Sequence, residues 1–484
     1  MIFFRRFQFL FILVSSIALA SLGDDRPNIL FILADDQSYE TIRAFEMTDI
    51  DTPNLDTLVA RGTTFTHAYN MGSWSGAVCV ASRHMLNTGA SVWNAERLSK
   101  GLGGKGKADP EIPNFEEEGL MWSQLMSKSG YQTYFTGKWH VRADPNKIFD
   151  VVRNVRAGMP KQTKTGYNRP VQGLPDAWSP FDESFGGFWE GGKHWSEVVG
   201  DDACDFLKEA KVDPNPFFMY IAFNAPHDPR QAPKAFVDLY PLDRIAIPEN
   251  FQADYPDRKL IDNPATLRDE HLAPVPRTEF AVQVHRQEYY AIITHMDEQV
   301  GRILEALESS GKADNTYIVF TADHGLAVGH HGFMGKQNLY DHSTRVPFMI
   351  VGPDIEGGRK MDAPIYLQDV MPTSLELAGI EKPDHVEFRS LLPLLAGESK
   401  GYPSIYGAYL KSQRSITKDG FKLIAYPKVP RVLLYDLEND PMEMNDLAEA
   451  KPDRVASLFA ALLKLQEEVN DTVDLKSAFP RLVK

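Results

Sequence analysis

Four short apolar runs in this sequence each end abruptly in polar residues, and this pattern constrains the fold more than any other feature. The runs cover residues 28–34, 131–136, 217–223 and 317–320. Continuous apolar runs of this length are typical of strands buried on both faces, as in parallel sheets. Ligands of open α/β sheets bind outside the carboxyl ends of the strands. We therefore expect the polar residues that follow the four runs to converge on one site.

Segments with helical spacing of apolar residues lie between these runs. They cover residues 54–61, 116–129 and 289–310, and the last is followed by Gly311, a residue type that commonly ends helices. Strands that alternate with helices predict an α/β fold, in which helices sandwich a large, mostly parallel β-sheet. Residues 141–199 are rich in proline, glycine and aromatic residues without periodicity, which is typical of a long functional loop.

The pattern changes after about residue 392. Residues 415–426 and 432–437 predict antiparallel strands, and residues 452–470 predict a terminal amphipathic helix. We therefore expect a catalytic α/β domain over residues 24–392 and a small α+β subdomain over residues 393–484.

Residues 1–23 have the organisation of a secretory signal peptide. Arg5-Arg6 precede an apolar stretch over residues 7–20, which ends in the small-x-small sequence Ala18-Leu19-Ala20. This stretch is shorter than the ~20 residues of a membrane-spanning helix, and no later segment has the required apolar length. The sequence therefore predicts a secreted or periplasmic protein that does not insert into a membrane.

The net charge of the chain is −15 at pH 7, which disfavours nucleic acid and anionic membranes as partners. A local basic cluster must then attract any anionic substrate. Five basic residues follow or flank the polar strand ends, and a ring of such cations would stabilise negative charge on a substrate. They are Arg83, Lys138, His140, His227 and Lys336.

Acidic residues follow the first and the last of the four runs, as Asp35-Asp36 and as Asp323-His324. A charged pair in isolation is usually a solvated part of a loop. Carboxylates that meet at one sheet edge, however, repel one another unless a cation neutralises them. Oxygen ligands of this kind are typical of Ca²⁺, and the imidazole nitrogen of His324 leaves Mg²⁺ or another divalent ion open.

Cys79 is one of two cysteines in the chain and begins the run Cys79-Val80-Ala81-Ser82-Arg83. A free cysteine is most often a small buried hydrophobe, and a disulfide with Cys204 is a second interpretation. The small polar residues and the apolar run after them indicate a loop that enters a helix. A nucleophile there would face unpaired N–H groups and the positive end of the helix dipole, which suit a sulfate or phosphate.

The run from Cys79 to Gly89 resembles the signature of the formylglycine-dependent type I sulfatases of the alkaline phosphatase superfamily. That signature reads Cys-x-Pro/Ala-Ser-Arg followed by Leu-x-Thr-Gly. The resemblance extends over most of the chain, through residues 28–30, 51–56, 367–374 and 434–441. Ala81 stands where many members have proline, which leaves open which maturation enzyme acts on this chain.

The resemblance implies a modified nucleophile, a metal site and a set of catalytic cations. A formylglycine-generating maturation enzyme would oxidise Cys79 to 3-oxoalanine (formylglycine), and one hydroxyl of its hydrate would attack sulfur. One divalent ion, Ca²⁺ or alternatively Mg²⁺, would be held by Asp35, Asp36, Cys79, Asp323 and His324. Arg83 and Lys138 would hold the nucleophile and the sulfate, His227 or Lys336 would protonate the leaving alcohol, and His140 would take the proton of the second hydroxyl.

The implied activity is hydrolysis of a sulfate ester with release of inorganic sulfate. A sulfated carbohydrate is the expected substrate, and a small sulfate ester is the alternative. A phosphonate monoester or phosphodiester hydrolase of the same superfamily is a second interpretation. A non-catalytic carbohydrate-binding relative is a third, which is disfavoured because every expected metal, nucleophile and cation position carries a competent residue.

Candidate substrate contacts come from the loop over residues 141–199 and from the residues after the third apolar run. His194 and Trp195 could contact sugar rings, and Arg230 could meet a second anion such as a uronate or another sulfate. Alternatively, the aromatic residues of the loop, including Trp178 and Trp189, fill a small core of the loop itself.

Overall fold

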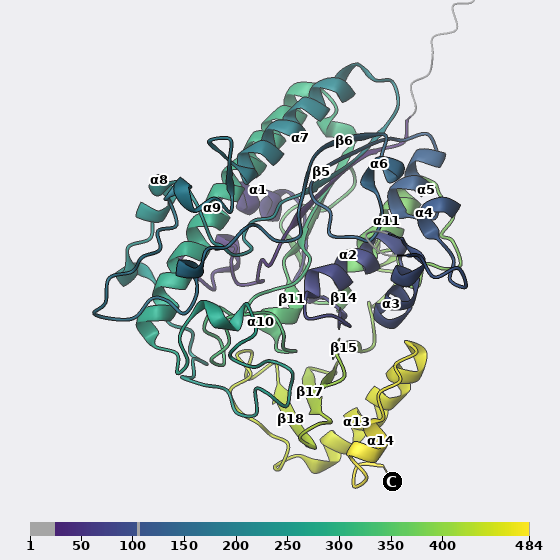
Figure 1. The fold of residues 1–484 in the computed structure, drawn as a ribbon. Helices are drawn as coiled ribbons and strands as arrows, with labels where there is room; N and C mark the ends of the chain where they lie inside the picture. Colours follow the sequence, from purple (N-terminus) through teal and green to yellow (C-terminus); the bar gives the residue numbers. More distant parts are fainter. Residues whose placement is uncertain (1–24, 104–106, 484) are drawn as a thin grey trace, which may run out of the picture.

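The computed structural model describes residues 25–103 and 107–483. The predicted signal peptide over residues 1–23 lies outside the described residues. Within them, a large sheet is flanked by helices on both faces, and a smaller sheet carries the C-terminal part of the chain (Figure 1). No helix in this part of the chain combines the length and the apolar character needed to cross a membrane. The predicted α/β class is confirmed.

The large sheet has eight strands, with β1 (Asn28–Ala34) near its centre. One side continues in parallel through β9 (Phe217–Ala222), β5 (Gln132–Lys138) and β6 (Val151–Arg156). The other side begins with β10 (Thr316–Ala322), also parallel to β1, and continues through β12 (Phe348–Val351), β2 (Thr63–Phe65) and β13 (Arg359–Met361). β1 and β9 are buried along their whole length, which explains their uninterrupted apolar sequences.

Two groups of helices cover the two faces of this sheet (Figure 1). The first group consists of α1 (Pro53–Arg61), α7 (Trp195–Val212), α8 (Lys234–Asp238) and α9 (Glu279–Ser310), in which the other three contact α9. The second group consists of α2 (Val78–Thr88), α3 (Val92–Gly101), α4 (Phe115–Glu118), α5 (Trp122–Lys128), α6 (Pro145–Ile148) and α11 (Val370–Leu377). Two short helices, α10 (Asp341–Thr344) and α12 (Leu392–Leu395), lie in the connections that follow β10 and α11.

Three smaller sheets complete the fold. The C-terminal sheet has the order β18 (Arg431–Asp436), β17 (Phe421–Tyr426), β16 (Gln413–Lys418), β15 (Ile405–Tyr409) and β4 (Gly72–Ser73), and it is followed by α13 (Pro452–Glu468) and α14 (Leu475–Ala478). A three-stranded sheet has the order β11 (Arg345–Val346), β3 (Ala68–Tyr69) and β14 (Ile365–Tyr366). A two-stranded sheet pairs β7 (Trp189–Glu190) with β8 (Lys193–His194). Strand β4 comes from the N-terminal part of the chain, so its pairing with β15 joins the C-terminal sheet to that part. The domain boundary between residues 392 and 393 stays a prediction.

The helix predicted over residues 289–310 is α9, which begins earlier, at Glu279, and ends as predicted before Gly311. The Thr278 side chain caps its start. Its first turns were missed because they bury polar side chains against polar partners, so no apolar spacing marks them: His285, Arg286 and Glu288. The helix predicted over residues 116–129 is divided into α4 and α5 by Gly119, whose φ is 69°.

The prediction of a single loop over residues 141–199 is wrong in part. Residues Val151–Arg156 form β6, the edge strand of the large sheet, and α7 begins at Trp195. Four residues of β6 are half-buried and two are exposed, so the apolar pattern that marks a central strand is missing. The single strand predicted over residues 415–426 is a hairpin, whose turn at Asp419-Gly420 has φ values of 51° and 73°. Asp-Gly is a typical sequence for such a turn.

Gly137 lies where β5 shifts its register against β6, directly before Lys138. Its φ is 96°, and a Cβ there would lie 1.8 Å from the carbonyl oxygen of Ala222 in β9. We expect Gly137→Ala to lower the free energy of unfolding by about 3 kcal/mol, since a left-handed backbone costs about 1–2 kcal/mol and overpacking about 1–3 kcal/mol. Urea unfolding measures this loss.

Gly173→Ala is the matched control for this prediction. Gly173 has a similar φ of 81°, but nothing lies within 4 Å of the added Cβ. It should therefore show only the backbone part of the loss, and equal losses in the two variants would contradict the clash at Gly137.

Candidate active site

The carboxyl ends of β1, β5, β9 and β10 meet at one edge of the large sheet, because these strands are parallel neighbours. Asp35 and Asp36 follow β1, and Lys138 is the last residue of β5. His227 lies in the turn after β9, and Asp323 follows β10. The structure brings all of these side chains into one buried network.

Asp35 occupies the half of the network that faces Arg83 and Lys138. Its Oδ2 accepts a hydrogen bond from the Lys138 ammonium, and its Oδ1 lies 3.8 Å from Arg83 Nη2. Arg83 also donates from Nε to Asp323 Oδ2 at 2.9 Å and from Nη1 to the Lys138 carbonyl oxygen at 2.6 Å. All four side chains are 0% exposed, so their charges interact with little screening by water.

Asp36 occupies the other half, with a φ of 72° that aspartate tolerates better than most residues. Its Oδ2 accepts a hydrogen bond of 2.6 Å from Lys336 Nζ and lies 3.7 Å from His227 Nε2. Its Oδ1 lies 3.0 Å from His324 Nε2. Its backbone N–H donates to Asp323 Oδ1 at 3.2 Å, which joins the two halves of the network.

His227 and Lys336 differ in protonation, and only one of them carries a proton that it can donate. His227 Nδ1 lies 2.7 Å from the carbonyl oxygen of Asp228, so Nδ1 is the protonated nitrogen and a neutral ring turns its Nε2 lone pair toward Asp36. Burial lowers the pKa of the Lys336 ammonium, but Asp36 and Asp269 outweigh burial and raise that pKa well above its usual range. Lys336 is therefore the charged member of this pair.

Cys79 lies in the first turn of α2, whose N-terminus is not capped by a side chain. Its Sγ lies 3.2 Å from His140 Nδ1. Burial raises the pKa of the thiol, but Lys138 and His140 outweigh burial and lower that pKa well below its usual range. The position of residue 79 thus stabilises negative charge, as a nucleophile requires.

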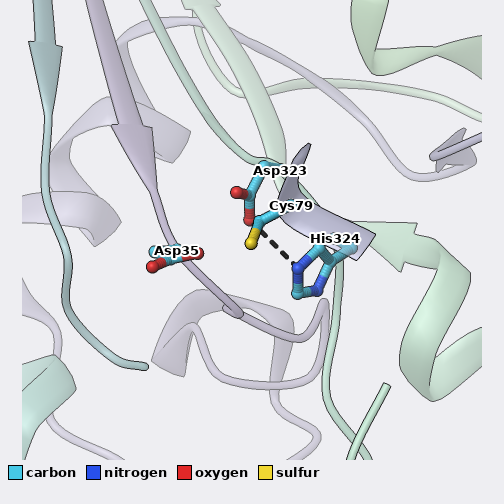
Figure 2. Close-up of side chains that lie close together, drawn as sticks. All are labelled: Asp35, Cys79, Asp323 and His324. Carbon is cyan, nitrogen blue, oxygen red and sulfur yellow. Dashed lines mark ion pairs between the residues drawn. The ribbon is translucent and has the colours of Figure 1, made fainter. Parts of the chain in front are cut away.

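Four side chains form a cluster that fits a divalent ion: Asp35, Cys79, Asp323 and His324 (Figure 2). Each offers a ligand atom, and these atoms lie within 4.8 Å of one another; Asp35, Asp36 and His227 form a second such group. Asp35 Oδ1, Asp36 Oδ1 and His324 Nε2 are buried and make no hydrogen bond of good geometry, although Asp36 Oδ1 and His324 Nε2 lie 3.0 Å apart. His324 Nδ1 donates to the Gly325 carbonyl oxygen at 2.8 Å, so a neutral ring keeps Nε2 as a free ligand.

The electrostatics of His324 agree with this fit. Burial lowers the pKa of His324, but Asp36 and Asp323 outweigh it and raise the pKa to about 10. The carboxylates thus favour a positive charge at this position, which the protonated His324 ring carries without an ion and which a divalent ion would carry when bound to the neutral ring. Carboxylate oxygens with one imidazole nitrogen suit a hard divalent ion such as Ca²⁺ or Mg²⁺.

Several residues of the site were missed by the sequence analysis. Asp269 lies 3.7 Å from Lys336 Nζ, and Arg268 forms ion pairs with Asp228 and Asp269. The Tyr289 hydroxyl donates to the Asp36 carbonyl oxygen at 2.5 Å. Residues 268 and 269 lie in a segment without periodicity, and Tyr289 looks like any apolar position of its helix, so no local signal marks them.

The two cysteines are both free thiols. Cys204 lies in α7, where its Sγ contacts the Arg302 carbonyl oxygen at 3.6 Å. The disulfide interpretation of Cys79 is therefore wrong.

His194, a predicted substrate contact, is 0% exposed and caps α7. Its Nδ1 accepts from the Ser196 N–H at 3.1 Å, and its Nε2 lies 2.9 Å from the Gln231 carbonyl oxygen, so both ring nitrogens are already occupied. Trp195 donates to Glu190 and lies under the Arg156 guanidinium. These contacts agree with the alternative interpretation, in which the loop aromatics pack on one another; Trp178 likewise stacks on Phe185.

Comparisons with known proteins show which families this chain resembles. Residues 27–380 match the family model described as Sulfatase, and residues 329–471 match the one described as N-sulphoglucosamine sulphohydrolase, C-terminal. A protein named Sulfatase from Formosa agariphila is 29% identical, covering 94% of this chain and 89% of its own length. An N-acetylglucosamine-6-O-sulfatase from Bacteroides thetaiotaomicron is 26% identical, covering 87% of this chain and 82% of its own.

Solved structures share the fold. One, in complex with its substrate D-glucosamine-2-N,6-O-disulfate, has a TM-score of 0.69 and 22% identity, covering 93% of this chain and 100% of its own. A phosphonate monoester hydrolase of Agrobacterium radiobacter has a TM-score of 0.67 and 22% identity, covering 91% of this chain and 95% of its own.

Proposed function

Because this chain belongs to the sulfatase family, we propose that it hydrolyses a sulfate ester of a carbohydrate through a nucleophile at residue 79 and one bound divalent ion. It is a sulfuric ester hydrolase; the modification of Cys79, the identity of the ion and the substrate are the proposed parts. The proposal includes residues 24–392 as the catalytic domain, residues 393–484 as a C-terminal subdomain, and export through a signal peptide over residues 1–23.

The arrangement around Cys79 is the observation that carries this proposal. Its Sγ belongs to the same cluster of potential metal ligands as Asp35, Asp323 and His324. His140 Nδ1 lies 3.2 Å from the same Sγ, and Lys138 and His140 both lower the pKa of the thiol. A cysteine with a purely structural role would not need metal ligands and cations around it. A non-catalytic sugar-binding protein would not need a nucleophile there either.

The cofactors supply chemistry that the unmodified chain lacks. Conversion of Cys79 to formylglycine, by a formylglycine-generating maturation enzyme, would supply a hydroxyl nucleophile. A Ca²⁺ ion, or alternatively Mg²⁺, held by Asp35, Asp36, Asp323, His324 and residue 79, would neutralise the carboxylates and polarise the sulfate.

The protein side chains then have separate roles. Arg83 is fixed by Asp323 and by the Lys138 carbonyl oxygen, and it orients residue 79 and the carboxylates around it. Lys138 stabilises negative charge on the nucleophile and on the sulfate oxygens. His140 contacts residue 79 directly and would take up the proton of the second hydroxyl of its hydrate. His227 and Lys336 face the leaving oxygen, and the tautomer of His227 favours Lys336 as the proton donor.

A sulfated carbohydrate is the proposed substrate class. A relative at 26% identity is named for a sulfated amino sugar, and a structure of the same fold binds a disulfated one. A small sulfate ester is the alternative, and a phosphonate monoester or phosphodiester is the second candidate because a phosphonate monoester hydrolase shares the fold.

An assay on matched substrates tests this proposal. We expect kcat/KM for 4-nitrophenyl sulfate to exceed that for 4-nitrophenyl phenylphosphonate and for bis(4-nitrophenyl) phosphate, and sulfated glucosamine to release inorganic sulfate. Mass analysis of the peptide around residue 79 from the same preparation measures its conversion. A higher kcat/KM for the phosphonate, or full activity with unmodified Cys79, would reject the proposal.

A further inference from the structure

Arg230 lies in the segment after β9, three residues beyond His227, and is only 3% exposed. Its Nη1 lies 3.2 Å from His285 Nδ1. Its Nε and Nη2 are buried without a hydrogen-bond partner. Two of the three guanidinium nitrogens of this buried cation therefore have no acceptor within the protein.

Neighbouring arginines form ion pairs with carboxylates, and Arg230 does not. Arg169 forms ion pairs with Asp176 and Glu288 at 2.6 and 2.7 Å. Arg268 pairs with Asp228 and Asp269. Among the described residues, no carboxylate oxygen lies within the 4.0 Å ion-pair distance of the Arg230 guanidinium. A buried and unpaired charge destabilises a protein, so its presence calls for a partner from outside the chain.

The contact with His285 does not neutralise the charge of Arg230. His285 Nε2 lies 2.8 Å from the Arg169 carbonyl oxygen and must donate to it, so Nδ1 accepts from Arg230. The imidazole is therefore neutral. Burial also lowers the pKa of His285 well below its usual range, in agreement with that tautomer. His285 positions the guanidinium and contributes no negative charge.

Arg230 is connected to the candidate active site through Tyr289. Its guanidinium lies 5.6 Å from the ring centre of Tyr289, whose hydroxyl donates to the Asp36 carbonyl oxygen at 2.5 Å. Arg230 is about as buried as the candidate nucleophile, with 3% exposure against 2% for Cys79. The loop after β6 contacts the segment that carries Arg230, since the Ala232 N–H donates to the Pro180 carbonyl oxygen at 3.1 Å.

We propose that Arg230 binds a second anionic group of the substrate, through the Nε and Nη2 donors that have no partner in the protein. The substrate class is then a saccharide with the scissile sulfate ester and at least one further sulfate or carboxylate. An Nε–Nη2 pair is suited to two-point recognition of either group. This inference rests on the proposed function and narrows its substrate.

Kinetics of Arg230→Gln on paired substrates tests the proposal. The probes are D-glucosamine-2-N,6-O-disulfate, D-glucosamine 6-sulfate, and a uronate-containing disaccharide with one sulfate. We expect the wild type to prefer a doubly anionic probe, and Arg230→Gln to reduce that preference in kcat/KM by about 10–100-fold, mainly through KM. Arg230→Lys should keep part of the preference. Arg302→Gln, which changes a partly exposed arginine of α9, should keep all of it. Loss of preference with the disulfate or with the uronate identifies the second anion as sulfate or carboxylate.

Thermal unfolding gives a readout that does not require turnover. Because the guanidinium has no carboxylate partner, Arg230→Gln should not lower Tm, and inorganic sulfate should raise Tm less in this variant than in the wild type. A structural role predicts the opposite, a clear drop in Tm. An unchanged substrate preference, or a Tm below that of Arg302→Gln, would overturn the proposal. Failure of the wild type to hydrolyse 4-nitrophenyl sulfate would instead reject the proposed function, and the Tm measurements would still decide the role of Arg230.

Discussion

Replacement of Cys79 by alanine is expected to lower kcat/KM for sulfate-ester hydrolysis by about 10⁴-fold or more, the usual effect of removing a covalent nucleophile. The thiol is small and lies at the start of α2, so the helix and its buried contacts should persist. Steady-state kinetics with 4-nitrophenyl sulfate measures the loss, and circular dichroism and Tm show whether the fold is intact.

Cys204→Ala is the matched control, since it removes the other free cysteine, in α7. It should retain the activity of the wild type. A second variant, Cys79→Ser, introduces a single hydroxyl at the position and separates simple nucleophilicity from the need for the oxidised residue. Substantial activity of Cys79→Ala would contradict the role of residue 79, and full activity of Cys79→Ser without oxidation would contradict the formylglycine.

Removal of divalent cations is expected to lower activity by about 10³-fold or more, because stabilisation by a catalytic metal amounts to several kcal/mol. Without the ion, the buried carboxylates of Asp35, Asp36 and Asp323 repel one another, so Tm should fall as well. Chelator titration followed by addition of Ca²⁺ or Mg²⁺ measures both effects and identifies the ion.

Asp323→Asn and Asp297→Asn form a matched pair for this metal prediction. Both aspartates are buried, but Asp297 on α9 accepts hydrogen bonds from the Asn54 and Leu55 N–H groups, at 3.1 and 2.7 Å, instead of facing the site. Asp323→Asn should reduce the bound metal measured by mass spectrometry. Asp297→Asn should lower stability and keep the metal. Equal metal content in the two variants, or full activity of the chelated protein, would contradict the metal site.

The parts of the fold that the sequence predicts well are those whose own residues carry the pattern. Residues 28–34 are apolar throughout because β1 is covered on both faces, and the predicted run and the strand have the same bounds. The start of α9 and the edge strand β6 were missed because their buried or half-buried faces include polar residues. In those elements the partners that satisfy each polar group come from distant parts of the chain, and no local period reports them.

The candidate active site likewise has features that the sequence predicts and features that only the structure shows. The Cys79 run and the acidic residues after two strands are visible in the sequence, because strand ends and a helix start are local features. The distances between them are not visible. Arg169, Arg230 and Arg268 look alike as sequence, yet two are neutralised and one is left with free donors.

The linear order of residues was therefore sufficient to establish the α/β class, the family resemblance and the candidates for nucleophile and metal ligands, since these depend on short motifs and on strand periodicity. Tertiary structure was needed to assign His194 to packing, to exclude the disulfide and to distinguish Arg230 from its neighbours. The reason is physical: ion pairing and burial depend on distances of a few ångströms between residues that are far apart in the chain, and only the folded arrangement sets those distances.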